Sequence, residues 1–188
     1  ELSNDINLIQ LQIDFGKQFV NEIKFCLNVL GNKIQAKDEE FHKNFSAVLQ
    51  IISFNINRTT YNGITESRTI DFIENTQLVD SLNTFYNFEY KGWDEAIKDY
   101  TRNVIAPFLM NFDHIPGDYS KGENYSKIET SQFDIPKKTI KDYKKNTFII
   151  NLLKQRLWLL EGQVLNYERL QNQMKNLVKH IEKEITND

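Results

Sequence analysis

The fold is decided by residues 2–34, LSNDINLIQLQIDFGKQFVNEIKFCLNVLGNKI, where apolar side chains recur at alternating intervals of four and three. This spacing is the 3.5-residue repeat of a coiled-coil-like helix, and nine of its ten positions are apolar. A further set of side chains widens the stripe, which predicts a helix buried by more than one neighbour. The set is Leu8, Leu11, Phe15, Phe19 and Cys26. Gly16 lies within the repeat, where it either lets another helix approach closely or is a tolerated defect.

A matching repeat lies near the end of the chain, where ten of eleven heptad positions between Ile150 and Ile185 are apolar or aromatic. It predicts a long closing helix over 141–185. Because the first and last helices share this character, we expect them to pack antiparallel as a spine. The sequence thus predicts an all-α fold, an elongated antiparallel bundle of about four main helices in a single domain.

The remaining elements follow from turn and capping signals. A second helix is expected over 39–56 with Asp38 as its cap, and a third over 76–112 with Asn75 as its cap. Residues 59–74 are expected to form a connector. The segment 114–137 is expected to be a long loop, which is either a functional lid or the slack needed to cross one end of the bundle.

Composition excludes several classes of protein. Lys+Arg 23 against Asp+Glu 26 gives a net charge of −3, which argues against a nucleic-acid binder held by bulk charge. The single cysteine, Cys26, excludes an intrachain disulfide framework. No apolar run approaches the ~18–20 residues of a membrane span.

No catalytic, metal-binding or cofactor-binding pattern stands out. His42, His114 and His180 are scattered, and Cys26 is expected to be a buried structural thiol. Glycine-rich phosphate loops and nucleophile-elbow patterns are absent from the sequence. The sequence therefore predicts a protein that is not an enzyme and needs no cofactor.

The third predicted helix carries more aromatic side chains than one helix face can bury: Phe85, Tyr86, Phe88, Tyr90, Trp93 and Tyr100. Either the 59–74 connector covers the surplus, or the surplus forms a partner surface. The candidate interaction residues are Tyr86, Tyr90 and Trp93, with Arg68 and Arg102 as polar anchors.

Part of the chain resembles a known pattern: Thr60-Tyr61, Ile64, Ser67, Ile70, Phe72-Ile73-Glu74-Asn75, Leu78, Leu82 and Phe85-Tyr86-Asn87. It is similar to an uncharacterised family of small single-pass membrane proteins from Gram-negative bacteria. Arg68 stands where that family usually has glycine, and Phe85 where it has its first tyrosine. The resemblance implies an inner-membrane anchor upstream of residue 1 and a periplasmic helical domain, but no activity.

These observations leave three functions open. The first is a non-enzymatic, extracytoplasmic interaction or scaffold domain of a membrane-anchored protein, which binds a protein partner and no nucleic acid. The second is a ligand-sensing four-helix-bundle domain. The third is a cytoplasmic coiled-coil adaptor. The long closing helix can also pair with a second copy of the chain, which adds a homodimer to the alternatives.

Overall fold

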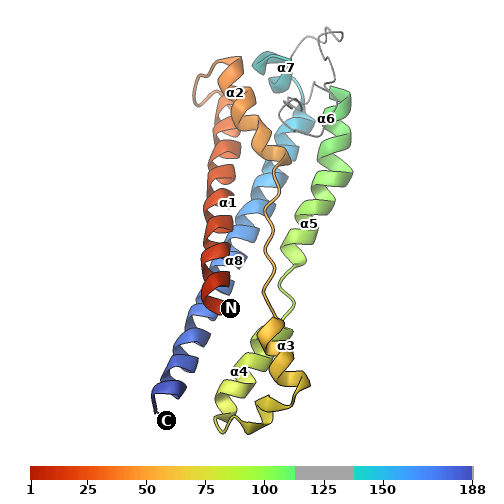
Figure 1. Cartoon of the computed structure of the whole chain (residues 1–188). Helices are drawn as coiled ribbons and strands as arrows, with labels where there is room; N and C mark the ends of the chain where they lie inside the picture. Colours follow the sequence, from red (N-terminus) through yellow and green to blue (C-terminus); the bar gives the residue numbers. More distant parts are fainter. Residues whose placement is uncertain (113–137, 188) are drawn as a thin grey trace, which may run out of the picture. The chain divides into compact units, whose positions relative to one another are not determined.

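The computed structural model describes residues 1–112 and 138–187, and the regular elements in these ranges are all helical (Figure 1). This confirms the all-α prediction. The chain divides into two compact units. Unit 1 comprises Glu1–Gln18, Ile51–Ala96 and Leu159–Asp188, and unit 2 comprises Phe19–Gln50 and Ile97–Trp158. The loop predicted at 114–137 lies outside the described residues.

In chain order, the α-helices of the described residues are α1 (Leu2–Leu30), α2 (Asp38–Phe45), α3 (Thr59–Glu66), α4 (Thr76–Asn87), α5 (Gly92–Tyr100), α6 (Ala106–Phe112), α7 (Ile140–Lys144) and α8 (Thr147–Asn187). Tight helical turns occupy Ser46–Leu49 and Thr69–Phe72, and a π-helical turn occupies Thr101–Ile105. The helices α1 and α8 each contribute residues to both units.

The heptad positions of both long helices are largely buried. In α1 the buried set includes Leu2, Ile9, Ile13, Gly16, Val20, Ile23 and Leu30, and in α8 it includes Leu153, Leu160, Val164, Tyr167, Gln171 and Met174. Within unit 1 the two helices touch directly. Lys17 Nζ lies 2.7 Å from Glu168 Oε1, and Gln171 Nε2 donates to the carbonyl of Ile6 at 3.2 Å. Their residue numbers change in opposite directions, so the two helices run antiparallel in unit 1.

The outer side of α1 differs from the expectation. Leu8, Leu11 and Phe15 were expected to widen the buried stripe, but they are 53%, 53% and 49% exposed. These three positions follow one another at intervals of three and four residues on the side of α1 opposite its buried heptad positions. Phe19 and Cys26 of the same set are partly and fully buried, so the prediction is wrong for Leu8, Leu11 and Phe15 and correct for Cys26.

Two helix starts and stops depart from the predictions for local reasons. The first helix ends at Leu30 rather than residue 34, because Asn32 takes a left-handed conformation with φ 57°. The Lys33 N–H then donates to the Asn28 carbonyl at 2.9 Å, a helix-terminating motif. Asp38 does not cap α2. It is the first helical residue, and its carboxylate accepts from the Ile140 N–H at 2.8 Å.

The predicted helix 39–56 is correct only in its first half. After the turn Ser46–Leu49 the chain becomes extended over residues 51–57, here called the extended segment. Its side chains alternate: Ile52, Phe54 and Ile56 are buried, while those between them are exposed. This period of two is typical of extended chain and not of the helix that was predicted.

The predicted helix 76–112 is broken into several pieces. It begins at Thr76 with Asn75 as the predicted cap, whose side chain accepts from the Leu78 N–H at 3.0 Å. The helix stops at Asn87 and restarts at Gly92. Further on, Pro107 follows a π-helical turn, in which the Ala106 N–H donates to the Thr101 carbonyl. A wider turn accommodates a residue that has no N–H of its own.

The other boundaries are corrected in smaller ways. The connector 59–74 is itself helical over α3 and the turn Thr69–Phe72. The closing helix predicted over 141–185 is interrupted, because α7 ends at Lys144 and α8 begins at Thr147. The side chain of Asn146 accepts from the Phe148 N–H at 3.0 Å, and this cap starts α8.

The structure decides between the two interpretations of Gly16. A Cβ atom at this position would lie 2.5 Å from Val164 Cγ2 and 2.9 Å from Ile52 Cδ1. We expect Gly16→Ala to lower the free energy of unfolding by about 1–3 kcal/mol, because Val164 is a stiff, β-branched neighbour. Denaturant melts would measure the loss.

The matched control is Gly63→Ala on α3, where nothing lies within 4 Å of the added methyl group. Alanine should stabilise this helix by up to about 1 kcal/mol. Equal effects of the two substitutions would show that helix propensity, and not close packing, determines the result at Gly16.

Candidate functional site

The most polar part of the interior of unit 1 is a cluster of Asp94, Gln163 and Tyr167, here called the buried polar cluster. These side chains are 2%, 0% and 0% exposed. Asp94 Oδ1 accepts from Tyr167 Oη and from Gln163 Nε2, both at 2.7 Å. The helices α5 and α8 supply the three residues, so the cluster joins these two helices through hydrogen bonds.

The buried polar cluster also holds the extended segment. Gln163 Nε2 donates to the Ile52 carbonyl at 3.0 Å, and Asp94 Oδ2 lies at 3.5 Å from the Phe54 amide nitrogen, which donates to it. Two further side chains continue the pattern. Tyr90 Oη accepts from the Ile56 N–H at 2.8 Å, and Asp5 Oδ2 accepts from the Asn57 N–H at 2.8 Å. Side chains thus take the place of a neighbouring strand.

The residue types of this cluster, an aspartate beside a tyrosine, are those of an acid–base site. Its side chains, however, are buried and contact one another and the extended segment. Burial and the nearby Asp94 raise the pKa of Tyr167 above its usual range. All three side chains face one another and the extended segment, and none reaches solvent. A general acid or base must lie within hydrogen-bonding distance of a substrate. We therefore assign the cluster to the fold.

A second buried polar group lies in unit 2. Arg156 of α8 is fully buried, and its Nη2 donates to the Gln50 carbonyl. Its Nε and Nη1, and the hydroxyl of Thr101, have no hydrogen-bond partner among the described residues. Burial lowers the pKa of the Arg156 guanidinium to about 10. The hydrogen bond to Gln50 ties α8 to the turn after Ser46–Leu49, as Gln163 ties it to the extended segment in unit 1.

The predicted aromatic surface does not exist as a surface. Tyr86 and Tyr90 are only 3% and 4% exposed. Tyr86 stacks on Tyr61 of α3, with ring centroids 4.3 Å apart, and Tyr90 packs against Phe54 of the extended segment. The sequence left open whether the 59–74 connector covers the surplus aromatic side chains. For Tyr86 it does, because Tyr61 lies in that segment.

The other predicted surface residues are also separated. Trp93 is partly buried, and its ring atoms would lie 2.4 Å from a Cβ placed on Gly162. Arg68 and Arg102 are exposed, the first in unit 1 and the second in unit 2. Arg68 takes φ 57°, in the left-handed region that favours glycine.

Cys26 and His42 both lie against backbone carbonyl groups of the fold. Cys26 is buried with Sγ 3.8 Å from the Phe41 carbonyl, and burial raises its pKa to about 12. His42 Nε2 lies 2.7 Å from the Lys138 carbonyl. Residues 1–112 and 138–187 contain no group of three or more His, Cys, Asp or Glu side chains placed to hold a metal ion.

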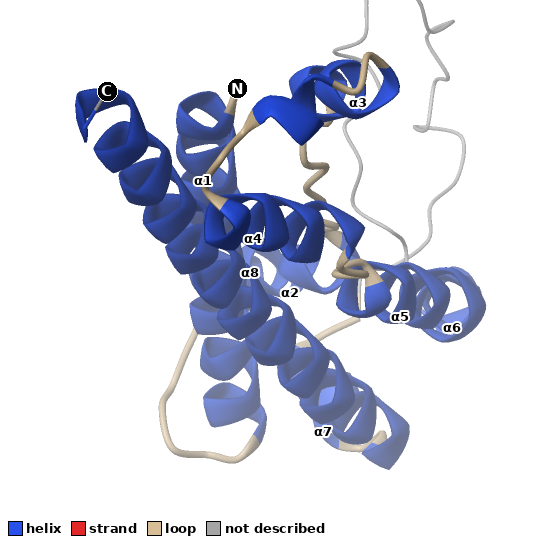
Figure 2. Ribbon diagram, turned by 90° about the horizontal axis from the view of Figure 1, so that it is seen from below, coloured by secondary structure: helices blue, strands red, loops and turns tan. Residues whose placement is uncertain are grey.

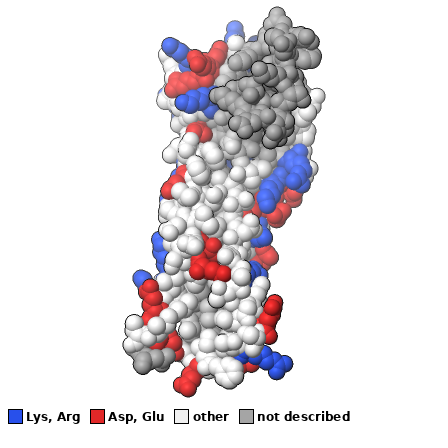
Figure 3. Space-filling model, in the orientation of Figure 1, with Lys and Arg blue, Asp and Glu red and all other residues white. Residues whose placement is uncertain are grey.

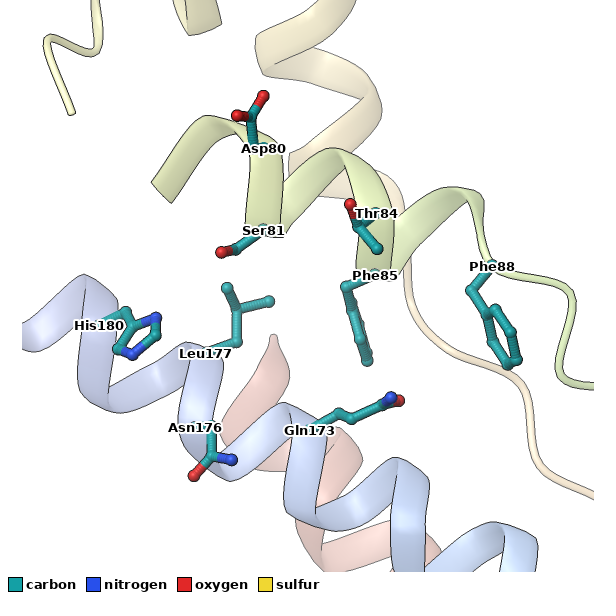
Figure 4. A pocket seen from close by; sticks show the side chains of 9 residues that line it. All are labelled: Asp80, Ser81, Thr84, Phe85, Phe88, Gln173, Asn176, Leu177 and His180. Carbon is teal, nitrogen blue, oxygen red and sulfur yellow. The ribbon is translucent and has the colours of Figure 1, made fainter. Parts of the chain in front are cut away.

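An open groove lies between α4 and α8 in unit 1, with a volume of about 380 Å³ (Figure 4). Figure 2 shows the ribbons of these two helices. We call it the α4–α8 groove. Figure 4 shows Phe85 pointing from α4 toward α8, and Leu177 pointing from α8 toward α4. Both are buried and form the apolar floor. Phe88, just after the end of α4, is 53% exposed at the edge of the groove.

Polar side chains surround this floor. They are Asp80, Ser81, Thr84, Gln173, Asn176 and His180. Ser81 donates to the Gln77 carbonyl at 2.8 Å within its own helix. The other five form no hydrogen bond to another described residue. The groove therefore combines apolar contact area with hydroxyl, amide, imidazole and carboxylate groups that face solvent.

Sequence reasoning missed this groove for an identifiable reason. Phe88 belonged to the noted aromatic run, but the helix was expected to continue through it, and Tyr90 and Trp93 were chosen instead. The break at residues 88–91 turns Tyr90 inward and leaves Phe88 outside. The available signal was Gly92, which marks the restart of the helix.

The buried polar cluster gives a direct test of its role. We expect Tyr167→Phe to lower the free energy of unfolding by about 1.5–3 kcal/mol, because a hydrogen bond to a buried carboxyl group is lost. Guanidinium chloride unfolding would measure the loss. Tyr100→Phe is the control, since its hydroxyl makes one 3.4 Å hydrogen bond to the Leu152 carbonyl and the side chain is half-buried. Similar losses in both variants would contradict the role of the cluster.

Comparisons with known proteins assign no family to the chain, so the description of the candidate site rests on its geometry. On the face shown in Figure 3, acidic and basic side chains are interspersed in small groups. Among the described helices, none is both long and apolar enough to cross a membrane. No protein-family model matches the chain, and no curated protein or solved structure is significantly similar to it. The family resemblance noted at residues 60–87 accordingly stays a prediction.

Proposed function

We propose that this protein is a non-enzymatic interaction domain that binds a segment of a partner protein in the α4–α8 groove. The observation that carries the proposal is the half-exposed Phe88 beside the buried floor of Phe85 and Leu177. Aromatic anchors over an apolar centre, with polar groups at the rim, are the usual anatomy of protein interfaces.

The chemistry of the rim suggests what the partner segment carries. Asp80 is the acidic residue of the groove, and no Lys or Arg is among its lining residues. Thr84, Gln173 and Asn176 offer hydrogen bonds to the backbone of a bound segment. We therefore propose a segment with one large apolar side chain for the floor and a basic residue for Asp80.

The location and wider architecture are also proposals. The family resemblance at residues 60–87 supports an extracytoplasmic domain anchored in the inner membrane. The antiparallel contacts of α1 and α8 in unit 1 support the proposal of an antiparallel bundle of about four main helices with the first and last helices as its spine. A ligand-sensing bundle and a cytoplasmic adaptor are the alternatives, and a groove that binds a protein segment is compatible with all three.

Selection of peptides from a random displayed library on the purified domain would test the proposal. We expect selected peptides to share an apolar residue next to Lys or Arg. Phe88→Ala should weaken their binding by about tenfold or more, because an aromatic interface anchor commonly contributes about 2 kcal/mol. Thr84→Arg should block binding by filling the groove with a long cationic side chain. Fluorescence anisotropy would give the dissociation constants.

The matched control is Phe72→Ala, which removes another exposed phenylalanine of unit 1, 84% exposed and outside the groove. This variant should bind the selected peptides as tightly as the unaltered protein does. Selected peptides that bind Thr84→Arg and Phe88→Ala with unchanged affinity would contradict the proposal. If the proposal holds, a photo-crosslinker placed at residue 84 in the native host would identify the natural partner. The affinity of that partner for the Phe88→Ala, Thr84→Arg and Phe72→Ala variants could then be measured in the same way.

A further inference from the structure

A second cavity of unit 1, of about 440 Å³, lies against the residues of α4 that do not face the α4–α8 groove. We call it the apolar cavity. Its walls come from the start of α1, from α3, α4 and the end of α8, with Leu2, Ile64, Leu78, Leu82, Val178 and Ile181 among the lining residues. Its size and apolar lining are typical of sites for small molecules.

One wall of the apolar cavity is aromatic and fixed. Tyr61 and Tyr86 both line it, and their rings are stacked at an interplanar angle of 13°. The hydroxyl of Tyr61 donates to Asn83 Oδ1 at 2.8 Å, which fixes its position. This wall therefore exists before any ligand binds, so little ordering cost opposes binding.

The charged side chains that line the apolar cavity are all acidic. They are Glu1 and Glu182, and no Lys or Arg is among the lining residues. The Glu1 carboxylate is held in place, because both its oxygens accept from the Thr60 N–H, at 3.0 and 3.2 Å. The side chain of Glu182 is exposed and makes no hydrogen bond to another described residue. An apolar space with carboxylates is complementary to an apolar cation.

We propose that the apolar cavity binds a small apolar molecule that carries a protonated amine. The hydrocarbon part lies among Leu78, Leu82 and Ile181, and the ammonium group pairs with Glu182. This site is separate from the groove of the proposed function, so either proposal can fail without the other.

Isothermal titration calorimetry with phenethylamine, phenethyl alcohol and phenylpropionate tests the proposal, because these probes share a ring and differ in charge. We expect the amine to bind more tightly than the alcohol, and the carboxylate to bind least. Glu182→Gln should weaken amine binding by about three- to tenfold, the range of a solvent-accessible ion pair of up to about 1.4 kcal/mol. Binding of the alcohol should not change.

Two variants complete the design. Glu66→Gln removes an exposed glutamate on α3 that does not line the cavity, and it should leave amine binding unchanged. Ile64→Trp should fill the cavity and abolish binding of all probes while circular dichroism stays helical. Any of three results would overturn the proposal: the amine fails to bind at millimolar concentration, the alcohol or carboxylate binds as tightly as the amine, or Glu182→Gln leaves amine affinity unchanged.

Discussion

The extended segment imposes the constraint on which unit 1 depends: an extended stretch of chain with no strand beside it buries every second side chain against helices. Its backbone N–H and C=O groups leave water, and an unpaired buried group costs about 1–3 kcal/mol. Asp94, Gln163, Tyr90 and Asp5 satisfy these groups one by one. Each of these side chains is buried and hydrogen-bonded inside unit 1, so none of them forms part of its surface.

These hydrogen bonds explain the break in the predicted third helix. Tyr90 must bring its hydroxyl to Ile56, and Asp94 must face Gln163 and Tyr167. The irregular residues 88–91 separate α4 from α5, so that Tyr90 and Asp94 both turn inward. The same break releases Phe88 to the exterior beside the α4–α8 groove. The hydrogen bonds that the extended segment requires thus determine which aromatic residue is exposed.

Sequence alone predicted those features that depend on regular spacing. The heptad positions of α1 and α8 and the cap at Asn75 are found in the structure. For Gly16 the sequence left two interpretations open, and the structure supports the close approach. It failed where a non-local partner outweighs local propensity. Residues 46–57 are apolar enough for a helix, and only the alternation of Ile52, Phe54 and Ile56 signals extended chain. The partners that make this conformation stable are distant in sequence, from 34 residues between Ile56 and Tyr90 to 111 residues between Ile52 and Gln163.

The candidate sites were less predictable than the fold, and the reason is again physical. A count of aromatic side chains shows that some must lie outside one helix face, but the count does not say which. The exposure of each aromatic side chain depends on the residue that packs against it in the folded chain. Tyr61 packs on Tyr86 and Phe54 packs on Tyr90, whereas Phe88 is 53% exposed. The α4 helix then presents two chemically different sides. Phe85 faces a groove with a polar rim, and Leu78 and Leu82 face a cavity whose charged lining residues are acidic. One twelve-residue helix, with Asn75 as its cap and a break at residues 88–91 as its end, thereby contributes to both recognition sites proposed for this protein.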